Sequence, residues 1–150
     1  MLEINRGLAK MVLRVLVETG FMLALNPRDK HHEWAMKILE EAKKREILLY
    51  ISPTAPIELS LIMKSKGYED KDIARVLNAI DVILEKYVKP QYPQIRLKEL
   101  VYATELRIRY PELTFFDSIH AATAIINNLT YYDFDQTIKN IIANEMGSTV

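Results

Sequence analysis

The sequence predicts an α/β domain of three layers, in which a parallel sheet is flanked by helices on both faces. Three short runs rich in Val, Ile, Leu and Tyr indicate strands at 11–17, 47–51 and 128–132. Longer segments with apolar residues at helical spacing separate these runs. Strands that alternate with helices pair in parallel through crossover connections, so the helices pack on both faces of the sheet.

Capping signals and helical periodicity locate the helices in chain order. The first opens at Pro27 and continues through Lys44. In the next, Ser52 followed by Pro53 is typical of an N-cap with proline at the first helical position, and Gly67 supplies the stop. Apolar residues at spacings of three and four predict further helices at 70–87, 95–109, 116–127 and 136–144.

Length and composition limit the class of protein. At 150 residues the chain has the size of a single domain, which we assign to 1–150. Residues 1–10 are either part of this domain or an N-terminal extension, because translation could start at Met1 or at Met11. The content of 49% hydrophobic and 27% charged residues is typical of a soluble globular protein, and no apolar run reaches the ~20 residues needed to cross a membrane. Without a secretory signal, a cytoplasmic location is expected.

The charged and sulfur-containing residues limit the chemistry. The chain has no cysteine, which excludes disulfides, a thiolate nucleophile and zinc sites of the cysteine type, and leaves carboxylate and histidine chemistry. Twenty basic and twenty acidic residues cancel. Contact with nucleic acid must therefore depend on a local patch rather than on net charge.

Four acidic side chains stand at the ends of apolar segments, where charged groups are normally paired or bound to a cation. They are Glu18 after VLRVLV, Glu58 after ILLYISPTAPI, Asp117 after LTFF and Asp133 after NNLTYY. Ligands of parallel sheets bind at the carboxyl ends of the strands, where Glu18 and Asp133 are expected. If the four segments converge, they form an oxygen-ligand cluster suited to Mg²⁺ or Mn²⁺, and the reaction it serves best is metal-assisted phosphodiester hydrolysis.

Each acid also has a purely structural interpretation. Glu18 has the position of an N-terminal acid for a helix that begins near Gly20. Glu58 has the position of an exposed residue within a helix, and Asp117 has that of a helix cap. The functional interpretation depends on the joint pattern, above all on Asp117 with His120 three residues later. We interpret His120 itself as a packed or hydrogen-bonded histidine rather than a catalytic one.

Four stretches in a fixed order connect these acids to a known family. They are LVETGFMLALNPRDKHHEWA at 16–35, ISPTAPIELSLIMKSKG at 51–67, LTFFDSIHAATAII at 113–126 and LTYYDFDQTI at 129–138. The chain resembles the PIN-domain family, the metal-dependent ribonucleases that include VapC-type toxins. This resemblance implies an RNA substrate and Mg²⁺ or Mn²⁺ held by acids from separate segments. It also implies a homodimer and an antitoxin protein whose peptide covers the acidic groove.

Carried over onto this sequence, the resemblance implies that Glu18, Glu58, Asp117 and Asp133 are the catalytic acids. An ion held by Glu18, Asp117 and Asp133 would orient a water, while Glu58 completes the shell through water or accepts the proton. Glu18 stands where the family usually has aspartate. Its extra methylene could move the ion by roughly one carbon–carbon bond, ~1.5 Å, a change that Mn²⁺ should tolerate better than Mg²⁺.

The fourth acid is a second departure from the family pattern. The usual aspartate would fall at Tyr131, so either the site has three acids or Asp133 has moved into place. Asp135 is expected to brace the next helix as an N-terminal acid.

The side chains expected to contact RNA lie beside the acids or on basic helix faces. Thr19 and Ser118 follow two of the acids and could bond a carboxylate, contact the scissile phosphate or simply cap a helix. For phosphate contacts we expect Arg107, Arg109 and Lys64.

The sequence therefore predicts a Mg²⁺- or Mn²⁺-dependent endoribonuclease, in the role of the toxin of a toxin–antitoxin pair. The alternative is a catalytically degenerate PIN domain that binds RNA or protein without cleavage, an interpretation favoured by Glu18 and by Tyr131 in the aspartate position. A third interpretation is an oligomeric structural partner, which would show no effect of metal on its stability.

Overall fold

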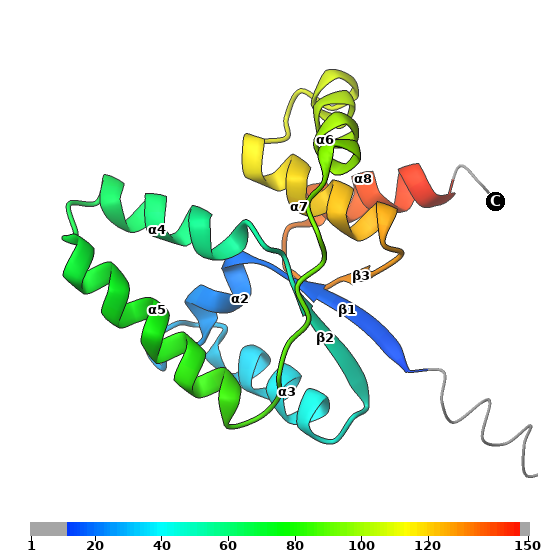
Figure 1. The fold of residues 1–150 in the computed structure, drawn as a ribbon. Helices are drawn as coiled ribbons and strands as arrows, with labels where there is room; N and C mark the ends of the chain where they lie inside the picture. The colour runs from blue at the N-terminus through cyan, green and yellow to red at the C-terminus, as the bar shows by residue number, and fades with distance from the viewer. Residues whose placement is uncertain (1–11, 148–150) are drawn as a thin grey trace, which may run out of the picture.

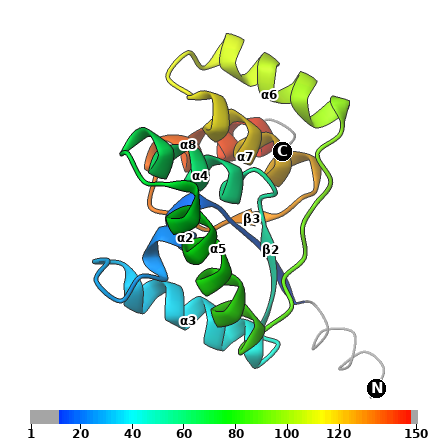
Figure 2. The same cartoon turned by 60° about the vertical axis from the view of Figure 1, so that its left-hand side comes forward.

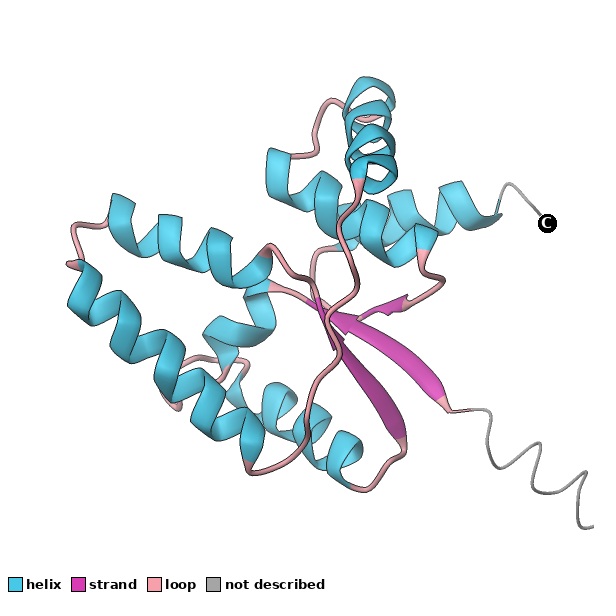
Figure 3. Ribbon diagram, in the orientation of Figure 1, coloured by secondary structure: helices cyan, strands magenta, loops and turns pink. Residues whose placement is uncertain are grey.

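In the computed structural model, which describes residues 12–147, the centre of the domain is a small parallel sheet (Figures 1 and 3). Its strands are β1 (Leu13–Val17), β2 (Ile47–Ile51) and β3 (Thr130–Tyr131), in the order β2-β1-β3. β1 pairs in parallel with both neighbours. The three predicted strands and their parallel pairing are confirmed. Met11 lies outside the described residues, and β3 is shorter than expected.

Alternate residues of β1 point to opposite faces of the sheet, and each face is covered by its own core. Val15 and Val17 belong to one cluster of buried apolar residues and Leu16 to the other. The first face is covered by α2 (Thr19–Ala24), α3 (His32–Lys43), α4 (Ala55–Ser65) and α5 (Asp70–Glu85). The second is covered by α6 (Leu97–Arg109), α7 (Phe115–Ile126) and α8 (Gln136–Gly147). The predicted three-layer arrangement is confirmed.

The outer edge of β2 is paired with the connection between α5 and α6, which Figure 2 shows running alongside the sheet. The amide of Ile51 donates to the carbonyl of Gln91 at 2.8 Å, and the amide of Gln91 donates to Leu49 at 3.0 Å. These bonds satisfy backbone groups that an exposed edge strand would leave unpaired.

The start of α4 differs from the sequence prediction, which placed it at Ser52 and Pro53. The helix begins at Ala55 with Thr54 at the N-cap, and Pro56 supplies the proline of its first turn. Ser52 instead extends the sheet, because its amide donates to the carbonyl of Val17 at 2.9 Å. The displacement leaves the Ser52 hydroxyl buried under the site described below.

The other predicted helices are confirmed with shifted ends. α3 begins at His32 rather than at Pro27, and α7 begins at Phe115 with Thr114 as its cap. Gly67 follows α4 with φ of 89°, the left-handed conformation that ends a helix. Within residues 12–147, no helix is both long enough and apolar enough to cross a membrane.

Candidate active site

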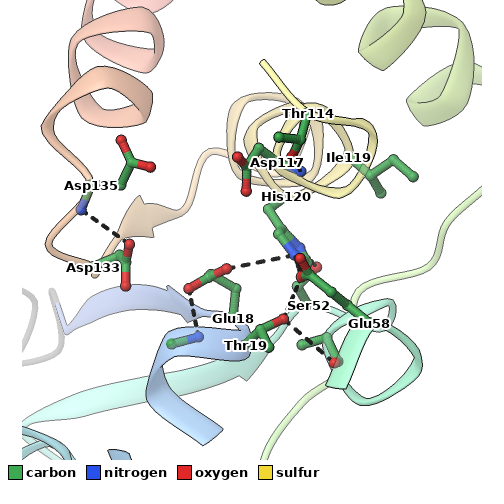
Figure 4. A network of polar contacts seen from close by, with 12 residues as sticks. Glu18, Thr19, Ser52, Glu58, Thr114, Asp117, Ile119, His120, Asp133 and Asp135 are labelled. Carbon is green, nitrogen blue, oxygen red and sulfur yellow. Dashed lines mark hydrogen bonds and ion pairs between the residues drawn. The ribbon is translucent and has the colours of Figure 1, made fainter. Parts of the chain in front are cut away.

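The four acids meet at the carboxyl end of the sheet, between the starts of α2, α4, α7 and α8 (Figure 4). Glu18 directly follows β1, and Asp133 lies two residues after β3. Glu58 and Asp117 stand in the first turns of α4 and α7. The expected convergence of these segments therefore occurs, and it brings carboxylates from four parts of the chain into one region.

The geometry of Glu18 shows its capping role and is compatible with the functional one. It is the N-cap of α2, and its Oε1 accepts a hydrogen bond from the amide of Gly20 at 2.8 Å. The residue is buried, and its carboxyl lies beside that of Asp133. Capping the helix thus orients the carboxyl into the cluster, so the structural and functional interpretations describe the same geometry.

Glu58 is held by two donors on one oxygen atom. Its Oε1 accepts the hydroxyl of Thr19 at 2.5 Å and contacts Nε2 of His120 at 2.9 Å. The other ring nitrogen of His120, Nδ1, lies 2.6 Å from the hydroxyl oxygen of Ser52. Nε2 is also 3.6 Å from Oε2 of Glu18, so one buried ring spans two carboxylates.

Asp117 is in the first turn of α7 but does not cap it. The cap is Thr114, whose hydroxyl oxygen accepts the amide of Asp117 at 3.3 Å. The carboxylate of Asp117 is close enough to Glu58, His120 and Asp135 to interact with them electrostatically. The capping interpretation of Asp117 is therefore wrong.

Asp133 lies in the acidic cluster, whereas Asp135 supports the start of α8. Asp135 accepts the amide of Ile138 at 3.1 Å and so braces the start of α8, as predicted. Its own amide donates to Oδ2 of Asp133 at 3.1 Å, which holds Asp133 beside Glu18. Tyr131, in the family's aspartate position, is buried in the core under α7 and α8, where burial, followed by the nearby charges of Glu18 and Asp133, raises the pKa of its hydroxyl.

Crowding of the acids changes their proton affinities. Burial, followed by the nearby charge of Asp133, raises the pKa of Glu18 from 4.5 to about 8. Burial likewise raises the pKa of Asp117, opposed by its hydrogen bond with Thr114 and reinforced by Glu58. Burial also acts on Glu58, but hydrogen bonds from His120 and Thr19 outweigh it and hold the pKa of Glu58 below its usual value. Among Glu18, Glu58 and Asp117, only Glu58 has surroundings that favour its ionised form.

The donor set fits a divalent cation. Candidate ligand atoms of Glu18, Glu58 and His120 lie within 4.8 Å of one another, and the carboxylate of Asp133 lies beside that of Glu18. Carboxylate oxygens are the ligands that Mg²⁺ and Mn²⁺ prefer, and a cation would offset both the burial of the Glu18 charge and its repulsion by Asp133.

The residues expected to contact RNA differ in burial and in distance from the acids, and each already has a bonded partner. Thr19 and Ser118 are buried and already bonded, Thr19 to Glu58 and Ser118 to the Arg107 side chain at 2.5 Å. Arg109 donates to Glu145 of α8 at 2.5 Å. Lys64 is exposed in the last turn of α4, the end away from Glu58, where it pairs with Asp70.

Sequence reasoning missed two residues of the site, His120 and Ser52. The sequence predicts a packed or hydrogen-bonded His120, which is confirmed, but it does not identify Glu58 as the partner. Its position three residues after Asp117 was the available signal. Ser52 carried no such signal, because the pattern Ser-Pro is that of a helix cap.

The fold and the acidic cluster define a class of α/β domains with a carboxylate site at the end of a parallel sheet. A model of the PIN domain family matches residues 15–143, and the chain belongs to this family. No curated protein matches the sequence at a significant level.

Solved structures of low sequence identity share the fold. VapC20 of Mycobacterium tuberculosis, a toxin that cleaves the sarcin-ricin loop, is 20% identical with a TM-score of 0.60, and the match covers 84% of this chain and 93% of that one. A chain of VapBC2 from Rickettsia felis, bound to a DNA fragment from its promoter, is 21% identical with a TM-score of 0.61, covering 86% and 93%.

Substitution of Gly20 with alanine should disturb the cluster without unfolding the domain. The added Cβ would lie 2.6 Å from Oδ1 of Asp133 and 2.9 Å from Oε1 of Glu18, both ends of side chains that can swing aside. We expect an unchanged melting temperature within a few degrees and Mn²⁺ affinity reduced by about 10-fold or more, by calorimetric titration. Gly147→Ala, with nothing within 4 Å of the added atom, is the control. Unaltered affinity in Gly20→Ala would contradict this geometry.

Stability of the metal-free protein should fall as pH rises from about 5 to 8. The folded state retains the proton of Glu18 up to a pKa of about 8, whereas the unfolded chain releases it near 4.5. Because the folded state binds more protons in this range, the free energy of unfolding decreases by up to about 1.4 kcal/mol per pH unit. Urea denaturation of the wild type and of Glu18→Gln at pH 5, 6.5 and 8 measures the difference. Parallel curves for the two proteins would show that Glu18 titrates normally.

Proposed function

We propose that this protein is a Mg²⁺- or Mn²⁺-dependent endoribonuclease. The observation that supports the proposal is the convergence of Glu18, Glu58, Asp117 and Asp133, from four separate segments, at one end of the sheet. Membership of the PIN domain family supports nuclease chemistry for such a cluster. Because the proposed substrate is RNA, we place this activity in the cytoplasm.

The carboxylates of Glu18, Asp117 and Asp133 would hold the ion, and Glu58 would complete the set directly or through water. A bound Mg²⁺ or Mn²⁺ lowers the pKa of a coordinated water and offsets charge that develops on the phosphate. Glu58, with its lowered pKa, is ionised at neutral pH and is the group suited to accept a proton from that water. Asp135 and Gly20 hold Asp133 and Glu18 in place through their backbone amides.

RNA is the proposed substrate, and its phosphates require cationic contacts. Arg107 lies beside the start of α7, where its guanidinium is 5.0 Å from the centre of the Phe115 ring and is bonded to Ser118. Phe115 and Ser118 are in the same first turn of α7 as Asp117, so the Arg107 cation of α6 packs against the turn that carries this acid. Arg109 and Lys64 are proposed as weaker contributors because each is already paired with an acid.

An antitoxin is the proposed protein partner, as in the VapBC2 complex that shares this fold. An apolar groove of about 480 Å³ runs between α2, α4 and α5. Its walls include Met22, Leu59 and Met63. Helices α2 and α4 contribute both to this groove and to the acidic site, so a partner segment seated in the groove would lie on two helices of the site.

Replacing Asp117 with asparagine should remove metal binding and cleavage together. The substitution keeps the shape of the side chain and the amide bond to Thr114 but removes one charged ligand. We expect Mn²⁺ affinity to fall on the order of 100-fold, with loss of metal-dependent cleavage of a structured RNA. The wild type should also melt at a higher temperature as Mn²⁺ is added, by mass action. Absence of Mn²⁺ binding by the wild type would contradict the proposal.

The degenerate binding module remains the second candidate, supported by Glu18 in place of aspartate. Glu18→Asp distinguishes the two, because it restores the usual ligand length. Cleavage that appears or increases in this variant would show an enzyme weakened by Glu18. RNA binding without cleavage in both proteins would support the binding module.

A homodimer is the proposed assembly, and α6 carries the surface suited to it. Leu97, Val101 and Ile108 form an apolar stripe on this helix and are 80%, 56% and 74% exposed. Apolar side chains that recur on one helix face favour contact with a second protein surface.

Val101→Lys should therefore shift the protein from dimer to monomer in sedimentation equilibrium, because it places a charge in the centre of the stripe. Val82→Lys, at an exposed valine of α5, is the matched control and should leave the dimer intact. A monomeric wild type at micromolar concentration would contradict the dimer.

A further inference from the structure

Three buried side chains outside the carboxylate set form a chain of contacts that ends on Glu58. Ser52, at the end of β2, lies 2.6 Å from Nδ1 of His120, and Nε2 of His120 lies 2.9 Å from Oε1 of Glu58. Thr19, at the start of α2, donates to the same oxygen at 2.5 Å. Ser52 and His120 are completely buried, and Thr19 is nearly so. None of these three groups is available to substrate.

We propose that Ser52 and His120 are positioning residues that hold Glu58 with Oε1 occupied and Oε2 directed to the cation. This inference rests on the proposed function, because it assigns a role to groups around the same site. Each carboxylate oxygen has about two lone-pair positions. Thr19 and His120 occupy both positions on Oε1. Among the described residues, no hydrogen bond is made to Oε2 of Glu58, which leaves that oxygen for an ion or its bound water.

The hydrogen-bond network determines which nitrogen of His120 carries a proton. A carboxylate oxygen only accepts hydrogen bonds, so the nitrogen that faces Glu58 must be the donor. Nε2 therefore carries hydrogen, and in the neutral ring Nδ1 accepts the hydroxyl proton of Ser52. The opposite tautomer would place a lone pair of Nε2 against the carboxylate at 2.9 Å. The Glu58 carboxylate thus selects this tautomer, and Ser52 stabilises it by donating its hydroxyl proton to the buried Nδ1.

A ring with its hydrogen directed at Glu58 is not itself a ligand of the cation. His120 is nonetheless close to two carboxylates, because Nε2 is 3.6 Å from Oε2 of Glu18. Groups that orient metal ligands in this way typically change metal affinity by about 10–100-fold when they are removed. The effect of Ser52 should be smaller than that of His120, because it acts through the ring.

The experiment combines Mn²⁺ titration calorimetry with nuclear magnetic resonance of protein labelled with ¹⁵N in its histidines. The chain has three histidines, so the ring signals of His120 can be assigned by comparison with His120→Gln. We expect protonated Nε2 and unprotonated Nδ1 in the wild type, with and without Mg²⁺. We expect Mn²⁺ affinity to fall about 10-fold or more in His120→Ala. Ser52→Ala should weaken binding less and loosen the tautomer preference, whereas Ser65→Ala, at an exposed site of α4, should change neither.

The glutamine variant separates positioning from packing. Its amide can donate to Glu58, so His120→Gln should recover part of the Mn²⁺ affinity lost in His120→Ala. It also keeps the test decisive if the alanine variant fails to fold. Wild-type Mn²⁺ affinity in both Ser52→Ala and His120→Ala would overturn the inference, and so would an affinity of His120→Gln no higher than that of His120→Ala. An unchanged ring spectrum together with wild-type affinity in Ser52→Ala would remove the role of Ser52. Loss of the Nε2 proton on addition of Mg²⁺ would overturn it as well, because it would make His120 a ligand.

Failure of the proposed function has a different signature. If the wild type does not bind Mn²⁺ at all, the ribonuclease proposal and this role of His120 fail together. If the wild type binds Mn²⁺ and cleaves RNA while the Ser52 and His120 variants do the same, only the positioning role is overturned.

Discussion

Parallel pairing of β1 with both β2 and β3 is the constraint on which the site depends. Parallel strands end at the same edge of the sheet, so Glu18, Ser52 and Asp133 arrive there from three segments that are far apart in the sequence. The helices that leave this edge add Glu58 and Asp117. Two buried cores, one on each face, keep the strand ends in register, because Val15 and Val17 pack into one core and Leu16 into the other.

The gathered acids repel one another, and the surrounding groups offset only part of that repulsion. Backbone amides of Gly20 and Asp135 hold Glu18 and Asp133, and side-chain donors hold Glu58. Burial, together with the nearby charge of Asp133, raises the pKa of Glu18 to about 8 in the metal-free protein. A cluster that is destabilised without a cation and supported by specific donors is typical of a functional site rather than of a structural ion-pair network.

Local patterns predicted most of the fold and the identity of the four acids. Helical periodicity and apolar runs depend on near neighbours, which is why the strands and the cores of the helices were predicted correctly. Helix ends were less well predicted, because they depend on competing interactions. Ser52 has the pattern of a cap, yet its amide donates to the carbonyl of Val17 and its hydroxyl bonds Nδ1 of His120. Because these groups are already bonded, Ser52 does not cap the helix, and α4 begins at Ala55.

The sequence by itself determined the class of fold, the order of its elements and the carboxylates available for a cation, because these follow from residue type and local spacing. Only the tertiary structure decided that Asp133 supplies a carboxylate beside Glu18 while Tyr131 is buried next to the same acids, since that depends on how the chain turns after β3. It also decided that His120 bonds Glu58, across 62 residues of sequence. Contacts of this kind require two helices and a strand to be packed at a definite distance, and no local pattern contains that distance.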